Sequence, residues 1–264
     1  MSLLLIDPQR CLRDGVCAEE CPRLLIEMPA GGACPVEVEG AEVLCNACGH
    51  CLAVCPTEAL SLRATVPADC PAVREELLPS AAQVEHFLRT RRSIRTFEPR
   101  PLPREVLEKL LDITRYAPSG GNRQPVEWLV VYHTEKVRRL AALAAAVLRE
   151  LPDFAYKDTL AVAARKGGDL VCRSAPHLVI AHTPQGQQTD GVIALTYLEL
   201  AAYSLGLGAC WSGFFTTAAH NSAAIQEALG LPEGHVICGT MLVGFPTHRY
   251  LRIPPRREAR VRWQ

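Results

Sequence analysis

The twelve cysteines of the chain are concentrated near its beginning, where nine of them fall within the first 70 residues. The stretch CNACGHCLAVCP at 45–56 has the spacing C-x2-C-x2-C-x3-C followed by proline. This spacing lets one loop wrap three thiolates around an iron–sulfur cluster, while the fourth cysteine lies beyond the loop. A zinc site would favour two separated C-x2-C pairs around a tetrahedral ion. Iron–sulfur chemistry is therefore predicted for Cys45, Cys48, Cys51 and Cys55.

An earlier stretch, CLRDGVCAEECP at 11–22, repeats these offsets with one change, because Asp14 stands where the second cysteine would be. A carboxylate is a harder and weaker ligand for iron than a thiolate. The stretch therefore predicts a [4Fe–4S] cluster with Asp14 as a ligand, or a [3Fe–4S] cluster that lacks one iron. The alternative is that Asp14 only makes a turn with Gly15. Cys34 and Cys70 lie outside this frame, and Cys34 is either a substitute ligand or a buried cysteine.

Residues 5–65 resemble a bacterial two-cluster ferredoxin. The resemblance implies that each cluster takes three ligands from one run and a remote cysteine from the other. One cluster would then be held by Cys21, Cys45, Cys48 and Cys51. The other would be held by Cys11, Cys17, Cys55 and the residue at position 14.

Later segments offer groups that suit a phosphate and a heterocycle. TRRSIRTF at 90–97 supplies arginines and a serine, which can donate hydrogen bonds to a phosphate. YAPSGGNRQPVEWLVV at 116–131 places a Pro-Ser-Gly-Gly-Asn loop before a strand. GLGACWSGFF at 206–215 and the basic RIPPRR at 252–257 follow in the chain.

In this order the four segments resemble the nitroreductase family of FMN enzymes, and the whole chain resembles ferredoxin–nitroreductase fusions. The resemblance implies an α+β fold in a domain-intertwined homodimer, with two active sites at its interface. The FMN phosphate and ribityl chain would be held by Arg91, Arg92, Ser93, Arg95, Arg256 and Arg257. The isoalloxazine would be reached from the partner subunit by Pro118, Ser119, Gly120, Asn122 and Gln124. Beside the ring near N5 would lie Trp211, Ser212 and Gly213.

Some of these residues have a simpler interpretation. Trp211 and Phe214 could belong to the core, the tail arginines could be a solvated face, and His177 and His182 are expected to be structural. No Ser/His/Asp or paired-carboxylate arrangement is apparent in the sequence, which suits an enzyme whose hard chemistry belongs to its cofactor. The region 151–176 would shape the substrate pocket, with Phe154 and Tyr156 as candidate lid residues.

The elements that must position these groups follow from hydrophobic periodicity and from proline and glycine. We expect a ferredoxin-like domain at 1–65, a proline-rich linker at 66–83 and a nitroreductase-like domain at 84–264. Helices are predicted at 103–115, 134–150 (capped by Thr134), 191–205 and 224–229. Buried strands are predicted at 126–133, 177–182 and 235–245.

Composition excludes several classes of protein. The 28 Lys and Arg residues balance the 28 Asp and Glu residues, which argues against nucleic-acid binding. No run of apolar residues is long enough to span a membrane, and the stretch MSLLLIDPQR lacks the features of a signal peptide. Many cysteines without such a signal indicate a cytoplasmic protein with metal-bound thiolates.

Together these observations predict an oxidoreductase with FMN and two iron–sulfur clusters, one of them [4Fe–4S]. Electrons would come from a low-potential donor or NAD(P)H, and a small nitro, quinone or enone acceptor would be reduced. One alternative is another flavin reaction on the same scaffold, such as reductive dehalogenation. A second is a non-catalytic electron-transfer flavoprotein.

Overall fold

The computed structural model describes residues 2–264, which group into two compact units. The first unit extends to Leu78 and also includes Gly121–Arg123. The second unit consists of Pro79–Gly120 and Gln124–Gln264.

The first unit is built from very short elements around a small core. Its strands are β1 (Leu4–Ile6), β2 (Ile26–Glu27), β3 (Val36–Glu37) and β4 (Leu60–Leu62), paired antiparallel as β1–β4 and β2–β3. Its helices are α1 (Val16–Glu19), α2 (Ala41–Leu44) and α3 (His50–Ala53), with 3-10 turns η1 (Pro67–Asp69) and η2 (Glu75–Leu77). Two cysteines, Cys17 and Cys51, belong to the buried core. A unit of this size has little apolar surface to bury, so a bound metal centre would add to its stability.

The backbone of the first unit repeats itself in its two cysteine runs. Each left-handed residue of the first run has a counterpart thirty-four positions later, in the pairs Arg13 and Ala47, Gly15 and Gly49, and Leu24 and Glu58. The same shift relates Cys11 to Cys45 and Asp14 to Cys48. The two runs therefore have the same local backbone conformation, and Asp14 takes the position of a cysteine within it.

The second unit is an antiparallel sheet covered by helices. Its strands are β5 (Glu127–Val131), β6 (His177–Pro184), β7 (Gly208–Trp211) and β8 (His235–Gly244), in the order β5-β6-β8-β7. Its helices are α4 (Ala81–Thr90), α5 (Arg104–Thr114), α6 (Thr134–Glu150), α7 (Lys157–Arg165), α8 (Gln188–Ser204), α9 (Gly213–His220) and α10 (Ala223–Leu229). The 3-10 turn η3 (Gly120–Asn122) is divided between the units, because Gly120 is grouped with the second unit and Gly121 and Asn122 with the first.

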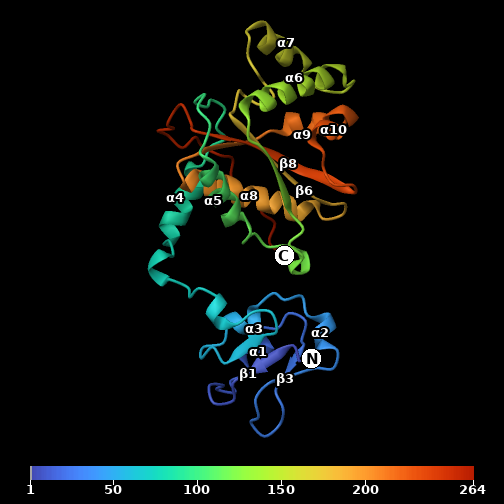
Figure 1. Ribbon diagram of the computed structural model, residues 1–264. Coiled ribbons are helices and arrows are strands. Elements are labelled where there is room, and N and C mark those ends of the chain that lie inside the picture. The colour runs from blue at the N-terminus through green and yellow to red at the C-terminus, as the bar shows by residue number, and fades with distance from the viewer. Residues whose placement is uncertain (1) are drawn as a thin grey trace. The chain divides into compact units, whose positions relative to one another are not determined.

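The central strand β6 is buried on both faces and divides two apolar cores. Leu178 and Ile180 point into a core formed with α6, α9 and α10, whereas Val179 and Ala181 point into a core formed with α5 and α8. Figure 1 shows these two groups of helices on opposite faces of the sheet. This double burial explains why β6 is a continuous apolar run without polar alternation.

Helix α8 is apolar on nearly all sides, as expected for a buried helix. Its two buried carboxylates both have partners. Asp190 Oδ1 accepts a hydrogen bond from the N–H of Gly120 at 3.0 Å, and Glu199 pairs with Arg91 at 2.7 Å.

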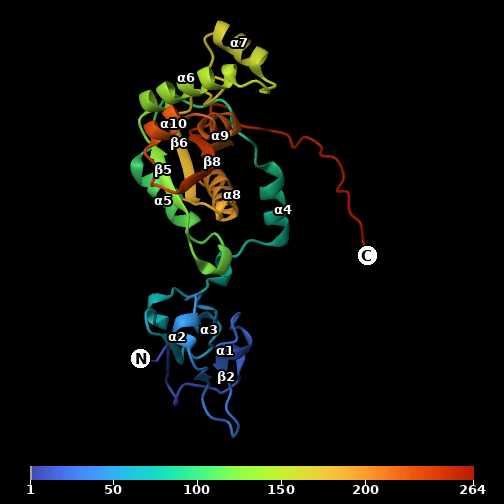
Figure 2. The ribbon, with the colours of Figure 1, turned by 90° about the vertical axis from the view of Figure 1, so that its right-hand side faces the viewer.

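The predicted helices and strands are present, with ends that differ by a few residues. Thr134 is the first residue of α6 and not its cap, since its hydroxyl donates to the carbonyl oxygen of Pro176 instead. The short elements β7, α7 and α9 were not predicted. Among residues 2–264, no helix is long and apolar enough to cross a membrane. The last residues, from Leu251 onward, form an exposed tail without regular structure, which Figure 2 shows leaving the second unit.

Candidate functional site

Four of the predicted iron ligands line one cavity in the first unit: Cys21, Cys45, Cys48 and Cys51. Burial raises the pKa of Cys51 to about 11, and the charges of the other three thiols raise it as well. The N–H of Ala47 donates to the sulfur of Cys45 at 3.4 Å, and the N–H of Leu25 donates to the sulfur of Cys21 at 3.3 Å. Such N–H···S bonds tune the potentials of iron–sulfur clusters.

A second cavity is lined by Cys11, Asp14, Cys17 and Cys55. The N–H of Ala59 donates to the sulfur of Cys55 at 3.3 Å, which repeats the bond to Cys21 in the other run. The structure therefore gathers the predicted ligands into two sets, each with a remote cysteine from the other run.

Asp14 and Cys34 differ in their relation to this second cavity. Asp14 is exposed, and its Oδ1 accepts a 3.4 Å hydrogen bond from the N–H of Val16, as in a turn. Burial raises the pKa of Cys11, and interactions with the side chain of Cys34 and the charge of Cys55 raise it further. Cys34 thus lies beside the predicted ligands although it stands outside their sequence frame.

The distances between the cysteine sulfur atoms can be compared with those of a zinc site. Zn–S bonds of about 2.3 Å place tetrahedral thiolates roughly 3.8 Å apart. Within residues 2–264, only Glu127, His182 and His235 bring three ligand atoms within 4.8 Å of one another. No three of the predicted cysteine ligands in this range meet that limit, so the cysteine sets are wider than a single zinc ion requires.

In the second unit, the arginine-bearing segment 91–95 lies beside strand β7. The N–H of Ile94 donates to the carbonyl oxygen of Ala209 at 2.9 Å. A Cβ on Gly208 would lie 2.8 Å from Cγ2 of Ile94, so only glycine allows this close approach. Two of the segments predicted to bind the cofactor, 90–97 and 206–215, are therefore neighbours in the fold.

The charged groups close enough to act on the Cys210 thiol of β7 are Arg91, Arg95, Arg173 and Glu199. Burial raises the pKa of Cys210, and Arg95 is the strongest of the groups that lower it. Burial also lowers the pKa of Arg173, with a further contribution from the like charge of Arg95. Three arginines and one carboxylate thus act on this thiol, and such a positive balance suits an anion such as a phosphate.

Arg173 had not been identified from the sequence. It adopts a left-handed conformation, with φ of 56°, in a turn organised by Asp169. The carboxylate of Asp169 accepts hydrogen bonds from the N–H groups of Cys172 and Ser174, at 2.9 and 3.0 Å. An aspartate that begins such a turn is the only local signal that could have indicated this position.

Arg92 and the two tail arginines lie apart from this group. Arg92 lies 5.7 Å from the ring of Tyr250 and lines a cavity of about 770 Å³ with Arg249 and Arg252. The side chain of Arg95 donates to the carbonyl oxygen of Ser93 at 3.4 Å. Arg256 and Arg257 lie in the exposed tail, away from this cavity's lining.

The loop that follows α5 lies at a different cavity, of about 440 Å³, lined by Pro118, Ser119, Gln124, Trp128 and Asp190 among others. The hydroxyl of Ser119 accepts a hydrogen bond from the N–H of Gln124 at 2.9 Å. Oδ2 of Asp190 is buried and has no hydrogen-bond partner among the described residues. Asn122 groups with the first unit. Within one chain, the predicted phosphate ligands and this loop are therefore not brought into one cavity.

Two of the three residues at the end of β7 and the start of α9, Trp211 and Ser212, make packing or hydrogen-bond contacts within the fold. The ring of Trp211 packs over Gly239, where a Cβ would lie 2.8 Å from it. The hydroxyl of Ser212 donates to the carbonyl oxygen of Val171 at 2.8 Å. Gly213, the first residue of α9, has open space where a Cβ would stand.

Three aromatic rings cluster at the start of α9. The ring of Phe214 lies 5.2 Å from Phe154 and 5.2 Å from Tyr156, between centroids. Tyr156 is half exposed. The two candidate lid residues therefore meet next to Gly213.

Known proteins share this arrangement of elements. A Bacteroides fragilis nitroreductase with bound FMN superimposes with a TM-score of 0.58 at 25% identity, covering 67% of this chain and 95% of that one. An Archaeoglobus fulgidus protein, provisionally named NADH dehydrogenase/NAD(P)H nitroreductase, is 29% identical over 60% of this chain and 82% of its own length. The iodotyrosine deiodinase of Haliscomenobacter hydrossis is 36% identical over 70 residues, which are 25% of this chain and 32% of that protein.

The α+β fold is that of FMN-binding nitroreductases such as the Bacteroides fragilis protein. The model of the nitroreductase family matches residues 88–245, more than half of the chain. The chain belongs to the nitroreductase family, and it is an oxidoreductase of that family.

Proposed function

We propose that this chain is an FMN-dependent oxidoreductase that receives electrons through iron–sulfur clusters and reduces a small organic acceptor. The observation that carries the FMN assignment is the bond between Ile94 and Ala209, which sets the arginine segment beside β7. The similar nitroreductase of Bacteroides fragilis has FMN bound. When bound, FMN supplies the hydride equivalent for the acceptor.

The residues of this chain bind and orient the cofactor. Arg91, Arg92, Ser93 and Arg95 hold its phosphate and ribityl chain, and we add Arg173 to this set. Trp211, Ser212 and Gly213 lie along one edge of the ring. Glu199 keeps Arg91 in place in the absence of an anion, through their 2.7 Å ion pair.

A homodimer would complete the site. Pro118, Ser119, Gly120, Asn122 and Gln124 would reach the ring from the partner subunit, because within one chain their loop lies apart from the phosphate segment. The tail carries apolar side chains in full contact with solvent, among them Trp263, which is 89% exposed. Large apolar side chains on a segment without regular structure would gain from burial against another surface. We propose that the tail packs on the partner and contributes Arg256 and Arg257 there.

The cluster assignments rest on the two thiol sets. We propose that one [4Fe–4S] cluster is bound by Cys21, Cys45, Cys48 and Cys51. For the other we propose Cys11, Cys17 and Cys55, with Cys34 as the fourth ligand. The interaction of Cys34 with Cys11 supports this choice, whereas Asp14 lines the second cavity but is exposed and accepts a hydrogen bond within its own turn. An Asp14-ligated [4Fe–4S] cluster and a [3Fe–4S] cluster are the competing outcomes.

The aromatic cluster of Phe154, Tyr156 and Phe214 favours a flat acceptor, such as a nitroaromatic compound or a quinone. Enones remain within the proposed class. Reductive dehalogenation is a second candidate, because an iodotyrosine deiodinase is 36% identical to this chain over 70 residues. The electron donor is a low-potential carrier or NAD(P)H, and the abundance of free thiols favours a cytoplasmic location.

Anaerobic purification with FMN, iron and sulfide measured per chain tests this proposal, followed by turnover of nitroaromatics, quinones, enones and iodinated phenols. We expect one FMN, about eight irons for two [4Fe–4S] clusters, and turnover of at least one acceptor class. Redox cycling of bound FMN without turnover of any acceptor would instead identify an electron carrier.

The route of the electrons needs its own variants. Cys48→Ser and Cys51→Ser should lose one cluster and slow reduction of the flavin by a low-potential donor. Cys70→Ser is the matched control, because Cys70 is an exposed cysteine outside both sets. Rapid flavin reduction by NADH in the cluster-deficient variants would reject an obligatory cluster route.

A further inference from the structure

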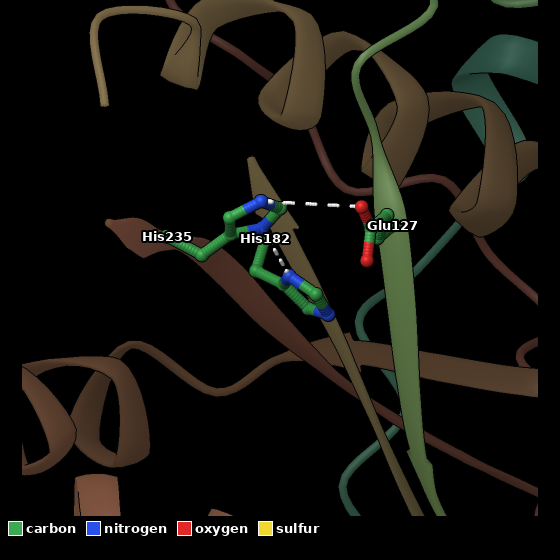
Figure 3. Close-up of side chains that lie close together, drawn as sticks. All are labelled: Glu127, His182 and His235. Carbon is green, nitrogen blue, oxygen red and sulfur yellow. Dashed lines mark hydrogen bonds and ion pairs between the residues drawn. The ribbon is translucent and has the colours of Figure 1, made fainter. Parts of the chain in front are cut away.

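Three side chains on neighbouring strands converge at the edge of the second unit's sheet. Glu127 of β5 is directly opposite His182 of β6, and His235 of β8 is opposite Pro184. Directly opposed residues point to the same face of a sheet, as do residues two apart on one strand. Glu127, His182 and His235 therefore share one face, as Figure 3 shows.

A β-bulge creates this arrangement. Ala181 pairs with Gly239 but His182 pairs with Ile237, so Cys238 is an extra residue in β8. Without the extra residue the register would move by one, and His235 would point to the opposite face from His182. Bulges often occur where a side chain must be redirected next to a functional site.

The distances between the three groups are short. Nδ1 of His182 lies 2.9 Å from Nδ1 of His235, and Nε2 of His235 lies 3.9 Å from Oε1 of Glu127. One ligand atom from each residue can be chosen so that all three lie within 4.8 Å of one another. His182 is only 4% exposed, whereas the Glu127 side chain is 59% exposed, so the group is buried on one side and open to solvent on the other.

We propose that Glu127, His182 and His235 form a binding site for a single divalent transition-metal ion of the zinc type. Two imidazoles and a carboxylate are ligands that zinc accepts at about 2.0–2.2 Å, and they leave a fourth position for water. Calcium and magnesium prefer oxygen ligands and are disfavoured here. The site is separate in chemistry from the cysteine sets, which offer sulfur.

The geometry requires a small adjustment. Two tetrahedral imidazole nitrogens on zinc would be about 3.3 Å apart, so the 2.9 Å contact between the histidines must open slightly. In the metal-free protein, the N–H of one imidazole donates a hydrogen bond to the bare nitrogen of the other. The ion takes the place of that proton.

Cobalt(II) is a suitable probe for the full-length protein, purified anaerobically with its clusters in place. Wild-type protein should bind one cobalt per chain at this site, with iron content unchanged. X-ray absorption at the cobalt edge should show nitrogen and oxygen neighbours and no sulfur. Sulfur in the coordination shell, or no cobalt bound, would overturn the proposal.

Variants locate the ion. His235→Asn and His182→Asn should abolish binding of this cobalt, whereas His86→Asn should retain it, because His86 lies on the exposed surface of α4. Glu127→Gln is a variant that should fold normally, because the Glu127 side chain is largely exposed. A loss of cobalt binding in this variant would therefore not be caused by misfolding. The substitution should weaken cobalt binding about tenfold or more, while Glu105→Gln on α5 leaves it unchanged. Equal affinity in Glu127→Gln, or unchanged stoichiometry in both histidine variants, would show a hydrogen-bonded histidine pair without a metal role.

Discussion

The N–H of Ile94 donates to the carbonyl oxygen of Ala209, so the segment that carries four predicted cofactor ligands runs beside β7. Further along, the N–H of Glu98 donates to the carbonyl oxygen of Phe245, and Phe97 bridges to Pro246. This edge is where the arginines meet the residues proposed to line the flavin. The position of the segment depends on how closely it can approach β7.

Gly208→Ala tests that dependence. The added Cβ would lie 2.8 Å from Cγ2 of Ile94, and such overpacking costs about 1–3 kcal/mol. We expect a lower Tm, by about 2–4 °C for each kcal/mol, and a reduced ratio of FMN to protein. Gly168→Ala is the control, because its Cβ would have only an ordinary 3.5 Å contact. Normal FMN content in Gly208→Ala would show that the segment does not position the cofactor.

Arg173→Gln should weaken FMN binding with little change in Tm. A hydrogen bond to a charged group contributes about 1.5–3 kcal/mol, so the Kd should rise about 10–100-fold. The loss should shrink at high salt, because screening weakens the same charge interaction in the wild type. Fluorescence titration of the apoprotein with FMN measures both effects. The control is Arg115→Gln, which changes an exposed arginine paired with Asp112 and should bind FMN normally. A normal Kd for FMN in Arg173→Gln would show that Arg173 does not belong to the site.

What could be predicted from the sequence depended on whether the signal was local. The cysteine runs and the arginine pair are contiguous, and β6 is an uninterrupted apolar run, so these features were recognised. Strand β7 has four residues and two of them are Gly208 and Ala209, which leaves too little periodicity to identify it. Arg173 and Cys34 are proposed for their sites because of interactions with residues distant in sequence, and no local pattern reports such interactions.

The contact between His182 and His235 could not be predicted from local sequence either. His182 was expected to be structural because it follows an apolar strand, and His235 begins another. Their meeting depends on a single extra residue in β8. A one-residue change of register moves a side chain to the other face of a sheet, and hydrophobic patterns rarely locate a bulge.

His177 makes the stability of the second unit depend on pH. Its Nε2 accepts a hydrogen bond from the N–H of Leu102 at 2.8 Å, and its Nδ1 donates to the carbonyl oxygen of Tyr132 at 2.8 Å. Burial lowers the pKa of His177, partly opposed by the bond to Tyr132. Because the folded pKa lies below the unfolded value of about 6.5, the unfolded chain takes up the proton first as pH falls. This contribution to stability is therefore complete above about pH 6.5 and is lost below it.

His177→Gln should lower the Tm near neutral pH by removing a buried hydrogen bond, at about 1–3 kcal/mol. It should also reduce the fall in Tm between about pH 7.5 and about pH 5.5. Some dependence should remain, because burial lowers the pKa of His182 too. Differential scanning calorimetry at both pH values measures this, with His86→Gln as an exposed control. An unchanged pH dependence in His177→Gln would contradict the assignment.

Cys34 and Asp14 make opposite predictions for the first cluster. If Cys34 is the fourth ligand, as its interaction with Cys11 indicates, then Cys34→Ser should alter the EPR spectrum of one cluster and lower its iron content. Asp14→Asn should then leave both the spectrum and the iron content unchanged, because its carboxylate only accepts the N–H of Val16. Cys70→Ser controls for the loss of a thiol outside both sets.

The measurement is made on anaerobically reconstituted protein, since a cluster with a weak ligand loses iron most readily. A [4Fe–4S] signal that persists in Cys34→Ser but converts to a [3Fe–4S] signal in Asp14→Asn would establish the carboxylate as the ligand. A [3Fe–4S] signal already present in the wild type would mean that neither residue holds the fourth iron. The predicted result is two [4Fe–4S] clusters that require Cys34 and not Asp14. It would mean that the fourth thiolate of the first cluster comes from Cys34, in the loop before β3.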